Sequence, residues 1–427
     1  MLDYKKDINT MKYLKSFRLH RFTYSFSWMA LVFILTYACD KSTVTPDKPG
    51  EETVTHQKSV QQASLDLYKE IAAQQDSRNF AISPLSIQIA LYMVYNGAEG
   101  ETREEIGELL HMMDADLETL NQQVEGLLEY LTNLVDNGHL DIHNALFYDQ
   151  DRVVLAEQFV DRLSRYFDVH DENLDFDDPS AVTSINGWVQ DKTYDKIQEV
   201  IQDISDLEVL FLINALYLKA DWVNGFLQEA TSDKPFTTTT GNEIMVPTMH
   251  QTTNVEHLTR EGAVIARLPL ADSALFVYLI MPDNPGDLED LFDSDFMKDL
   301  WENNLEFQSS RFRFEMPLVE IKTHLNLNET LQSLGMVTAF NPEKAELSQM
   351  GESKSGLPLH ISRTLHDVYL RMDERGVEGA AVTTVGVGVT SLPPALQFNK
   401  PFAYLIVDQQ YNIPVFMGQF TGIEAKN

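Results

Sequence analysis

Cysteine, positive charge and long apolar runs are scarce in this chain of 427 residues. Cys39 is the only cysteine, so no disulfide can form within the chain. Lysine and arginine number 32 against 65 aspartates and glutamates, and the net charge of −33 excludes the basic surface that nucleic-acid binding requires. Apolar residues make up 44% of the sequence, which is enough for a large core and too many for a disordered chain.

The sequence also lacks the short motifs of common enzyme classes. It contains no G-x-S-x-G, no H-E-x-x-H, no P-loop and no G-x-G-x-x-G. The 11 histidines have no metal-ligand spacing, so we predict neither a metal nor a cofactor. Serine and histidine are too frequent for counting to exclude a hydrolase, and a pairing of Ser83 with His366 remains as that alternative.

The first 38 residues have the order of a secretory signal. A basic segment follows Met11, and an apolar run then covers residues 28–35, which is too short for a comfortable membrane span. The segment ends LTYAC at residues 35–39, which resembles a bacterial lipobox with Cys39 as the lipidated residue. The alternative is an ordinary cleaved signal. Either Met1 or Met11 is the start.

Residues 39–57 are polar and contain two prolines, which is typical of a flexible tether. We predict one folded domain over residues 58–427, because no later linker or repeat interrupts it. Helical periodicity covers residues 60–73, 86–96 and 116–137, and strand-like runs cover residues 274–281, 312–317, 368–372 and 403–407. Helices first and strands later predict an α+β domain with largely antiparallel sheets.

Residues 379–398 carry no charge and are rich in valine, threonine and alanine. Alternate positions from Val377 form a small apolar face, and Glu378 supplies the only charge on the other. A permanent buried strand is one interpretation, but residues 377–392 far exceed the usual strand of about five or six residues. Their glycines favour a segment that exists as a loop and later becomes a strand.

This segment resembles the hinge of the serpins, a family of serine-proteinase inhibitors. Residues 374–381, ERGVEGAA, are similar to the usual EEGTEAAA hinge. Further similar segments follow the family's order, and the resemblance covers about residues 58–424. They are residues 79–87 (NFAISPLSI), 97–102 (GAEGET), 185–189 (INGWV), 212–219 (LINALYLK), 334–336 (LGM), 398–402 (FNKPF) and 416–418 (FMG).

The resemblance implies the serpin fold, with three β-sheets, eight or nine helices and an exposed reactive-centre loop. A target proteinase attacks this loop and forms an acyl-enzyme, and the freed hinge then inserts into a sheet and distorts the enzyme. Gly379 stands where inhibitory members usually carry alanine, whereas the uncharged Val377 favours the inhibitory class. The hinge residues that the family implies are Glu374, Gly376, Val377, Glu378, Gly379, Ala380 and Ala381.

The family's spacing from Glu374 implies a scissile bond between Thr390 and Ser391, with Val387 and Val389 as alternatives to Thr390. A small β-branched residue at the cut suits the shallow pocket of an elastase-like proteinase and excludes pockets built for arginine or lysine.

The resemblance also implies residues that control the opening of the sheet. The polar cluster beneath the two central strands, called the shutter, consists of Ser83, Ser86, Asn214 and His366. In this cluster His366 is interpreted as a core histidine with its hydrogen bonds satisfied, not as a catalytic base. Trp222 is similar to the tryptophan at the top of the sheet, where the hinge enters.

We therefore expect a monomeric inhibitor of serine proteinases, with cysteine proteinases as a further target class. The signal and Cys39 predict export across the inner membrane of a bacterium and lipid anchoring to its outer membrane or cell surface. The alternative function is a non-inhibitory serpin that acts as a binding or carrier module.

Thr390→Arg is expected to shift inhibition from elastase-like to trypsin-like proteinases, because the trypsin pocket carries an acidic base. Rates of inhibition with both enzymes, together with mass-spectrometric mapping of the cleaved chain, measure this change. A cut outside residues 387–391 would show that the predicted bond is wrong.

Overall fold

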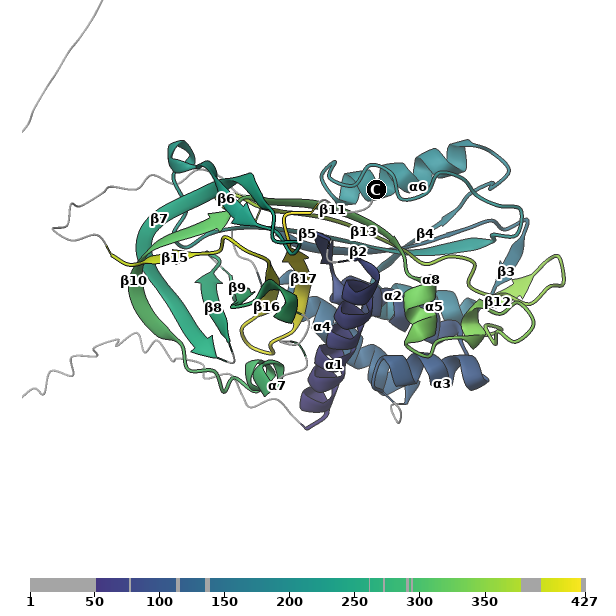
Figure 1. The fold of residues 1–427 in the computed structure, drawn as a ribbon. Helices are drawn as coiled ribbons and strands as arrows, with labels where there is room; N and C mark the ends of the chain where they lie inside the picture. Colours follow the sequence, from purple (N-terminus) through teal and green to yellow (C-terminus); the bar gives the residue numbers. More distant parts are fainter. Residues whose placement is uncertain are drawn as a thin grey trace, which may run out of the picture. The chain divides into compact units, whose positions relative to one another are not determined.

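The computed structural model contains a mixed array of helices and sheets (Figure 1). It describes residues 51–76, 78–112, 116–134, 139–260, 262–271, 273–288, 292, 295–377 and 393–423. These residues form eight α-helices and three β-sheets, which confirms the predicted α+β class. The helices are α1 (Glu51–Gln74), α2 (Pro84–Gly97), α3 (Gly100–Leu109), α4 (Leu117–Thr132), α5 (Glu157–Phe167), α6 (Ser180–Lys192), α7 (Asp295–Trp301) and α8 (Asn328–Ser333).

The six-stranded sheet has the order β11-β13-β14-β5-β2-β4. Only β2 and β4 pair in parallel, and every other neighbouring pair in this sheet is antiparallel. Its strands are β2 (His139–Tyr148), β4 (Val169–Asn173), β5 (Leu210–Asp221), β11 (Val319–Asn326), β13 (Leu365–Met372) and β14 (Gly376–Val377).

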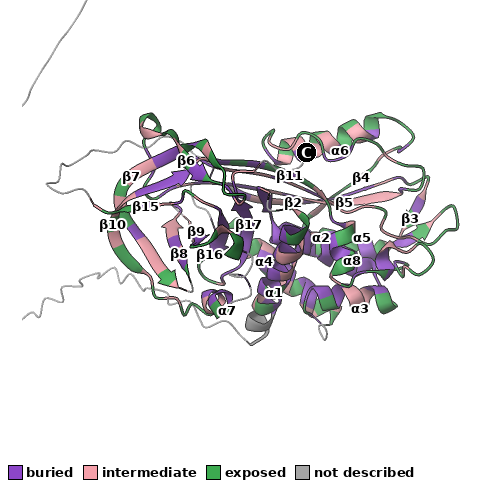
Figure 2. Ribbon diagram, viewed as in Figure 1, coloured by how far each residue is buried: buried purple, intermediate pink, exposed green. Residues whose placement is uncertain are grey.

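The nine-stranded sheet has the order β1-β17-β16-β9-β8-β7-β10-β15, and β6 pairs with β7 beside this path. Strands β16 and β17 are buried along their whole length, as Figure 2 shows, because both of their faces are covered. The strands are β1 (Phe80–Ile82), β6 (Ser232–Thr237), β7 (Glu243–Arg260), β8 (Ala263–Pro269), β9 (Leu275–Pro282), β10 (Gln308–Pro317), β15 (Ala395–Gln397), β16 (Phe402–Asp408) and β17 (Pro414–Phe420). The third sheet pairs β3 (Val153–Leu155) with β12 (Gly351–Ser353).

Separate apolar cores lie on the two faces of the six-stranded sheet. The larger core includes α2 together with Leu218 and Ala220 of β5. The smaller core joins α6, through Ile185 and Val189, to Phe147 of β2. Figure 1 shows α6 on one face and α2 on the other, so the sheet is a layer between two sets of helices.

Helix α1 begins earlier than the sequence predicted. We expected a tether up to residue 57 and a helix from about Val60, but the helix starts at Glu51. Within its first turns Gln57 Nε2 donates to the carbonyl of Tyr411 at 2.5 Å, and Gln61 Nε2 donates to the same carbonyl at 2.8 Å. Contacts with the turn between β16 and β17 therefore extend the helix into the predicted tether. None of the helices in the described part of the chain is long and apolar enough to cross a bilayer.

Candidate functional site

The six-stranded sheet is incomplete between β5 and β13. Both strands pair with the two-residue β14: Gly376 faces Asp221, and Val377 faces Ala220 on one side and Met372 on the other. Since each strand runs antiparallel to β14, β5 and β13 are parallel to each other, and β14 joins their carboxyl ends. Within the described ranges no other ladder pairing links them, so among these residues the amino-terminal parts of both strands are open edges.

Trp222 holds the turn that leads from β13 into β14. Its indole Nε1 donates to the carbonyl of Asp373 at 2.8 Å, and its backbone N–H donates to the carbonyl of Arg375 at 2.7 Å. The backbone N–H of Asp373 donates to the carbonyl of Gly376 at 3.0 Å, which closes the turn. The structure thus places Trp222 beside the hinge, at the carboxyl end of β5.

Glu374, the first residue of the predicted hinge, is buried in the same turn. Its carboxylate accepts a hydrogen bond from Thr231 Oγ1 at 2.5 Å, and its carbonyl accepts one from the backbone N–H of Phe226 at 2.7 Å. Hydrogen bonds to a buried carboxylate offset the cost of removing it from water. The hinge is therefore anchored at its start, before β14 begins.

Gly376 and Val377 lie in the sheet, whereas we expected them in an exposed loop. A Cβ atom at Gly376 would lie 2.1 Å from the carbonyl oxygen of Ala220, so only glycine fits there. Val377 is 1% exposed and belongs to the large core. The expectation was wrong because a valine between two strand edges gains both apolar burial and backbone pairing. Outside the described residues lie Glu378, Gly379, Ala380, Ala381, Val387, Val389, Thr390 and Ser391, and also Cys39.

Strand β15 follows the predicted reactive bond and belongs to the nine-stranded sheet. It pairs in parallel with β10, and Gln397 faces Glu315 in this ladder. Gln397 Nε2 donates to Glu315 Oε2 at 2.8 Å, and Lys234 Nζ lies 2.9 Å from Glu315 Oε1. The segments that precede and follow the predicted bond are therefore fixed in two different sheets.

Three of the predicted shutter residues are joined at the start of α2. Ser83 caps this helix, because its Oγ accepts from the backbone N–H of Ser86 at 3.1 Å. The backbone N–H of Ser83 donates to His366 Nε2 at 3.1 Å. Burial lowers the pKa of His366 to about 3, so its imidazole is neutral at pH 7. His366 thus accepts a backbone hydrogen bond, as expected for a core histidine, and the hydroxyl of Ser83 is a helix cap.

Asn144 is a further member of this cluster that sequence reasoning missed. Ser86 Oγ donates to Asn214 Oδ1, and Asn214 Nδ2 donates to Asn144 Oδ1 at 2.8 Å. Asn144 Nδ2 in turn donates to the carbonyl of Phe167 at 2.7 Å. Asn144 and Asn214 are facing residues of β2 and β5. A polar residue in the middle of an apolar strand was the available signal, but β2 itself was not predicted.

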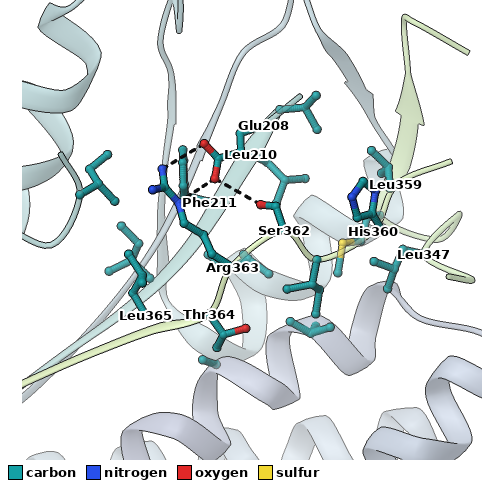
Figure 3. Close-up of a pocket in the computed structure, with 18 of the residues that line it drawn as sticks. Glu208, Leu210, Phe211, Leu347, Leu359, His360, Ser362, Arg363, Thr364 and Leu365 are labelled. Carbon is teal, nitrogen blue, oxygen red and sulfur yellow. Dashed lines mark hydrogen bonds and ion pairs between the residues drawn. The ribbon is translucent and has the colours of Figure 1, made fainter. Parts of the chain in front are cut away.

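A cavity of about 620 Å³ lies along the open edges of β5 and β13. It is lined by Leu91 of α2, by Val189 of α6, by the first residues of β5 and by the segment that precedes β13. Figure 3 shows side chains from β5, such as Leu210, opposite those of the segment 359–365. The cavity thus lies at the amino-terminal parts of β5 and β13, away from β14, and its lining is mostly apolar. Groups of metal-ligating side chains are absent from the residues described.

A family model described as serpin (serine protease inhibitor) matches residues 58–423 of the chain. The chain belongs to the serpin family. Serpin A3-6 of Bos taurus is 30% identical to it over 396 residues, which cover 90% of this chain and 93% of that protein. The match confirms the serpin fold, with its three sheets, that the sequence predicted.

Solved serpin structures have the same fold. The thermophilic serpin tengpin in its native state has a TM-score of 0.78 and 28% identity, and the match covers 88% of this chain and 96% of tengpin. Human thyroxine-binding globulin complexed with thyroxine has a TM-score of 0.77 and 26% identity, with 86% and 98% covered. Serpins are generally protease inhibitors, but a hormone-binding protein also shares this fold.

His366 is expected to make this serpin less stable as the pH falls from 7 to 5. Its pKa in the folded protein, about 3, lies below the unfolded value of 6.5, so only the unfolded chain takes up a proton in this range. The contribution at pH 5 is about 2 kcal/mol. His366→Gln, which keeps an acceptor for Ser83, should lose about that much of the pH dependence in urea unfolding. An identical pH dependence in both proteins would contradict the assignment.

Proposed function

We propose that this serpin inhibits serine proteinases by trapping them as its reactive loop inserts between β5 and β13. The observation that carries the proposal is β14, which is already paired at one end of two otherwise open strand edges. In the same register each further loop residue faces one residue earlier in β5, which brings Val387 to Leu210, where β5 begins. A strand over residues 376–387 would thus match the full length of β5.

Backbone pairing supplies the driving force for insertion. The added strand satisfies donors and acceptors on both open edges, at a net gain of roughly 1 kcal/mol for each hydrogen bond, or on the order of 10 kcal/mol in total. The uncut loop cannot form all of these hydrogen bonds, because its far end is held by β15 in the nine-stranded sheet. Cleavage removes that restraint.

The target enzyme is proposed to attack the carbonyl carbon of Thr390. Its serine oxygen forms an ester with Thr390, the bond to Ser391 breaks, and the new amine leaves with Ser391. Hydrolysis of this ester by water, which would free the enzyme, then competes with insertion of the loop, which would trap it. In the inserted strand, Val387 would face Leu210, the first residue of β5. Only a few residues would then separate this strand from the enzyme, so the enzyme would be pulled against the serpin. The small Thr390 favours elastase-like targets.

A carrier is the second candidate, because thyroxine-binding globulin is among the similar structures. The uncharged Val377 and its position within the sheet favour inhibition, since a hinge that pairs with both strands is suited to further insertion.

We also infer that the protein is a monomeric lipoprotein of a bacterial envelope, on the basis of the signal-like residues 1–38 and the LTYAC segment. Cys39→Ala is expected to release it from membranes, because the lipid would be its only anchor. Membrane fractionation of cells that express each form tests this. Equal partitioning of the two forms would contradict lipid anchoring at Cys39.

Trapping itself is tested with an elastase and the hinge variant Val377→Arg. The wild type should form a covalent complex that survives a denaturing gel, whereas the variant should mainly be cleaved. Because Val377 already lies in the core of the uncut protein, arginine there should release β14 from the sheet, and insertion would then have to bring an unpaired charge back into the core at a cost of several kcal/mol, while the bait bond is unchanged. Because Val377 is buried in the uncut protein, the variant should also be less stable than the wild type.

Val377→Thr is the matched control, because threonine has nearly the shape of valine and occupies this position in the usual hinge. It should retain most of the complex. Wild-type yield of complex from the Val377→Arg protein would show that hinge insertion is not the mechanism. Cleavage of the wild type without any complex would favour the carrier.

A further inference from the structure

An ion pair crosses the gap at the end opposite to β14. Arg363 Nε lies 2.7 Å from Glu208 Oε1, and Arg363 Nη2 donates to Glu208 Oε2 at 3.0 Å. The Glu208 side chain is only 5% exposed and that of Arg363 22%. Figure 3 shows the two side chains facing each other at the edge of the cavity. The contact therefore combines one charge-assisted hydrogen bond, from Nη2, with a close approach of Nε that does not have hydrogen-bond geometry, and a hydrogen bond between charged groups is stronger than one between neutral groups.

The two residues occupy equivalent places on the two strands. Glu208 lies just before Leu210, where β5 begins, and Arg363 lies just before Leu365, where β13 begins. Because β5 and β13 are parallel, the ion pair joins their amino ends while β14 joins their carboxyl ends. The open edges are thus bridged at both ends, with the cavity between the bridges.

Further hydrogen bonds fix both side chains to residues 203–208, the segment that leads into β5, so Arg363 ties the start of β13 to that segment. Glu208 Oε2 accepts from the backbone N–H of Ser205 at 2.7 Å, and the carbonyl of Glu208 accepts from Arg152 Nη1 at 2.9 Å. Arg363 Nη2 donates to the carbonyl of Asp203 at 2.5 Å. A link between two well-anchored groups transmits force from one strand to the other.

We propose that the Arg363–Glu208 pair is a latch that holds the amino ends of β5 and β13 together and opens when the loop inserts. This inference rests on the proposed function, since in the registers of β14 continued insertion would bring residue 386 opposite Arg363 and Val389 opposite Glu208, between the two side chains. The latch stabilises the uncut protein alone, so it slows insertion before cleavage and is absent from the inserted form. Arg363 and Glu208 are therefore positioning residues for the trapping reaction.

Glu208→Gln tests the latch in two forms of the full chain. The first form is the uncut protein. The second is cut in the loop by a metalloproteinase, which forms no acyl-enzyme, and mass spectrometry confirms the cut within residues 378–391. In guanidinium chloride the variant's midpoint should fall by about 0.3 M in the uncut form and stay within about 0.1 M of wild type in the cut form. Arg363→Gln should behave alike, and the double variant should add little further loss.

Glu256→Gln is the matched control. Glu256 pairs with Arg267 within the nine-stranded sheet, between β7 and β8, where Nε and Nη2 both lie 2.7 Å from Glu256 Oε2; because the Glu256 side chain is 40% exposed, against 5% for Glu208, a smaller loss is expected. Its effect should be equal in the uncut and cut forms. If Glu208→Gln lowered the unfolding midpoint equally in both forms, the pair would be an ordinary stabilising contact and the latch would be overturned. An unchanged midpoint of the uncut form would also overturn the latch. If cutting the loop does not raise the wild type's unfolding midpoint in guanidinium chloride, the proposed insertion itself is wrong.

Discussion

The constraint on which this structure depends is the missing pairing between β5 and β13. Two parallel strands in the middle of a sheet ordinarily satisfy their backbone groups with a common neighbour, yet here that neighbour is the two-residue β14. The remaining edges border a cavity of about 620 Å³ instead of a strand. Among the described residues, the sheet therefore lacks hydrogen bonds and packing that a longer β14 would supply.

Local chemistry keeps the gap in this state. At the carboxyl end, Trp222 and Glu374 fix the turn, and Gly376 allows the backbone to approach Ala220 closely. Beneath the strands, the hydrogen-bonded cluster that contains Asn214 and His366 satisfies polar groups that a tightly packed apolar core would leave unpaired.

Sequence periodicity predicted the local elements well. The expected α2 and the strands β9, β10, β13 and β16 occur close to the predicted positions, and the hinge motif marked Gly376 and Val377. Long-range contacts explain the failures. Helix α1 starts early because Gln57 contacts Tyr411, far away in sequence. Helix α4 ends at Thr132, before the predicted residue 137, and Asp116, the first residue of the predicted helical run, is its N-cap.

The candidate site was only partly predictable for the same reason. Trp222 and the shutter residues were predicted from family motifs, because each of them lies in or near a short segment that resembles the family. The burial of Val377 depends on strands more than a hundred residues apart in the chain, and the pairing of Arg363 with Glu208 has no local signal. Asn144 had a local signal, but β2, the strand that contains it, was not predicted. Such partners become visible only when the register of β2, β5 and β13 is known.

The two-residue β14 has a kinetic consequence. Starting a strand is the slow part of building one, since the chain must lose conformational freedom before enough hydrogen bonds repay the loss. In this protein that nucleus exists before any enzyme arrives, with Val377 buried and Gly376 in register. After a cut, only elongation of β14 would remain, in which each further loop residue adds its backbone hydrogen bonds to the end of the strand. Under the proposed insertion, the uncut protein holds the new strand at its first step, and the lifetime of this state would be set by a barrier and not by an equilibrium.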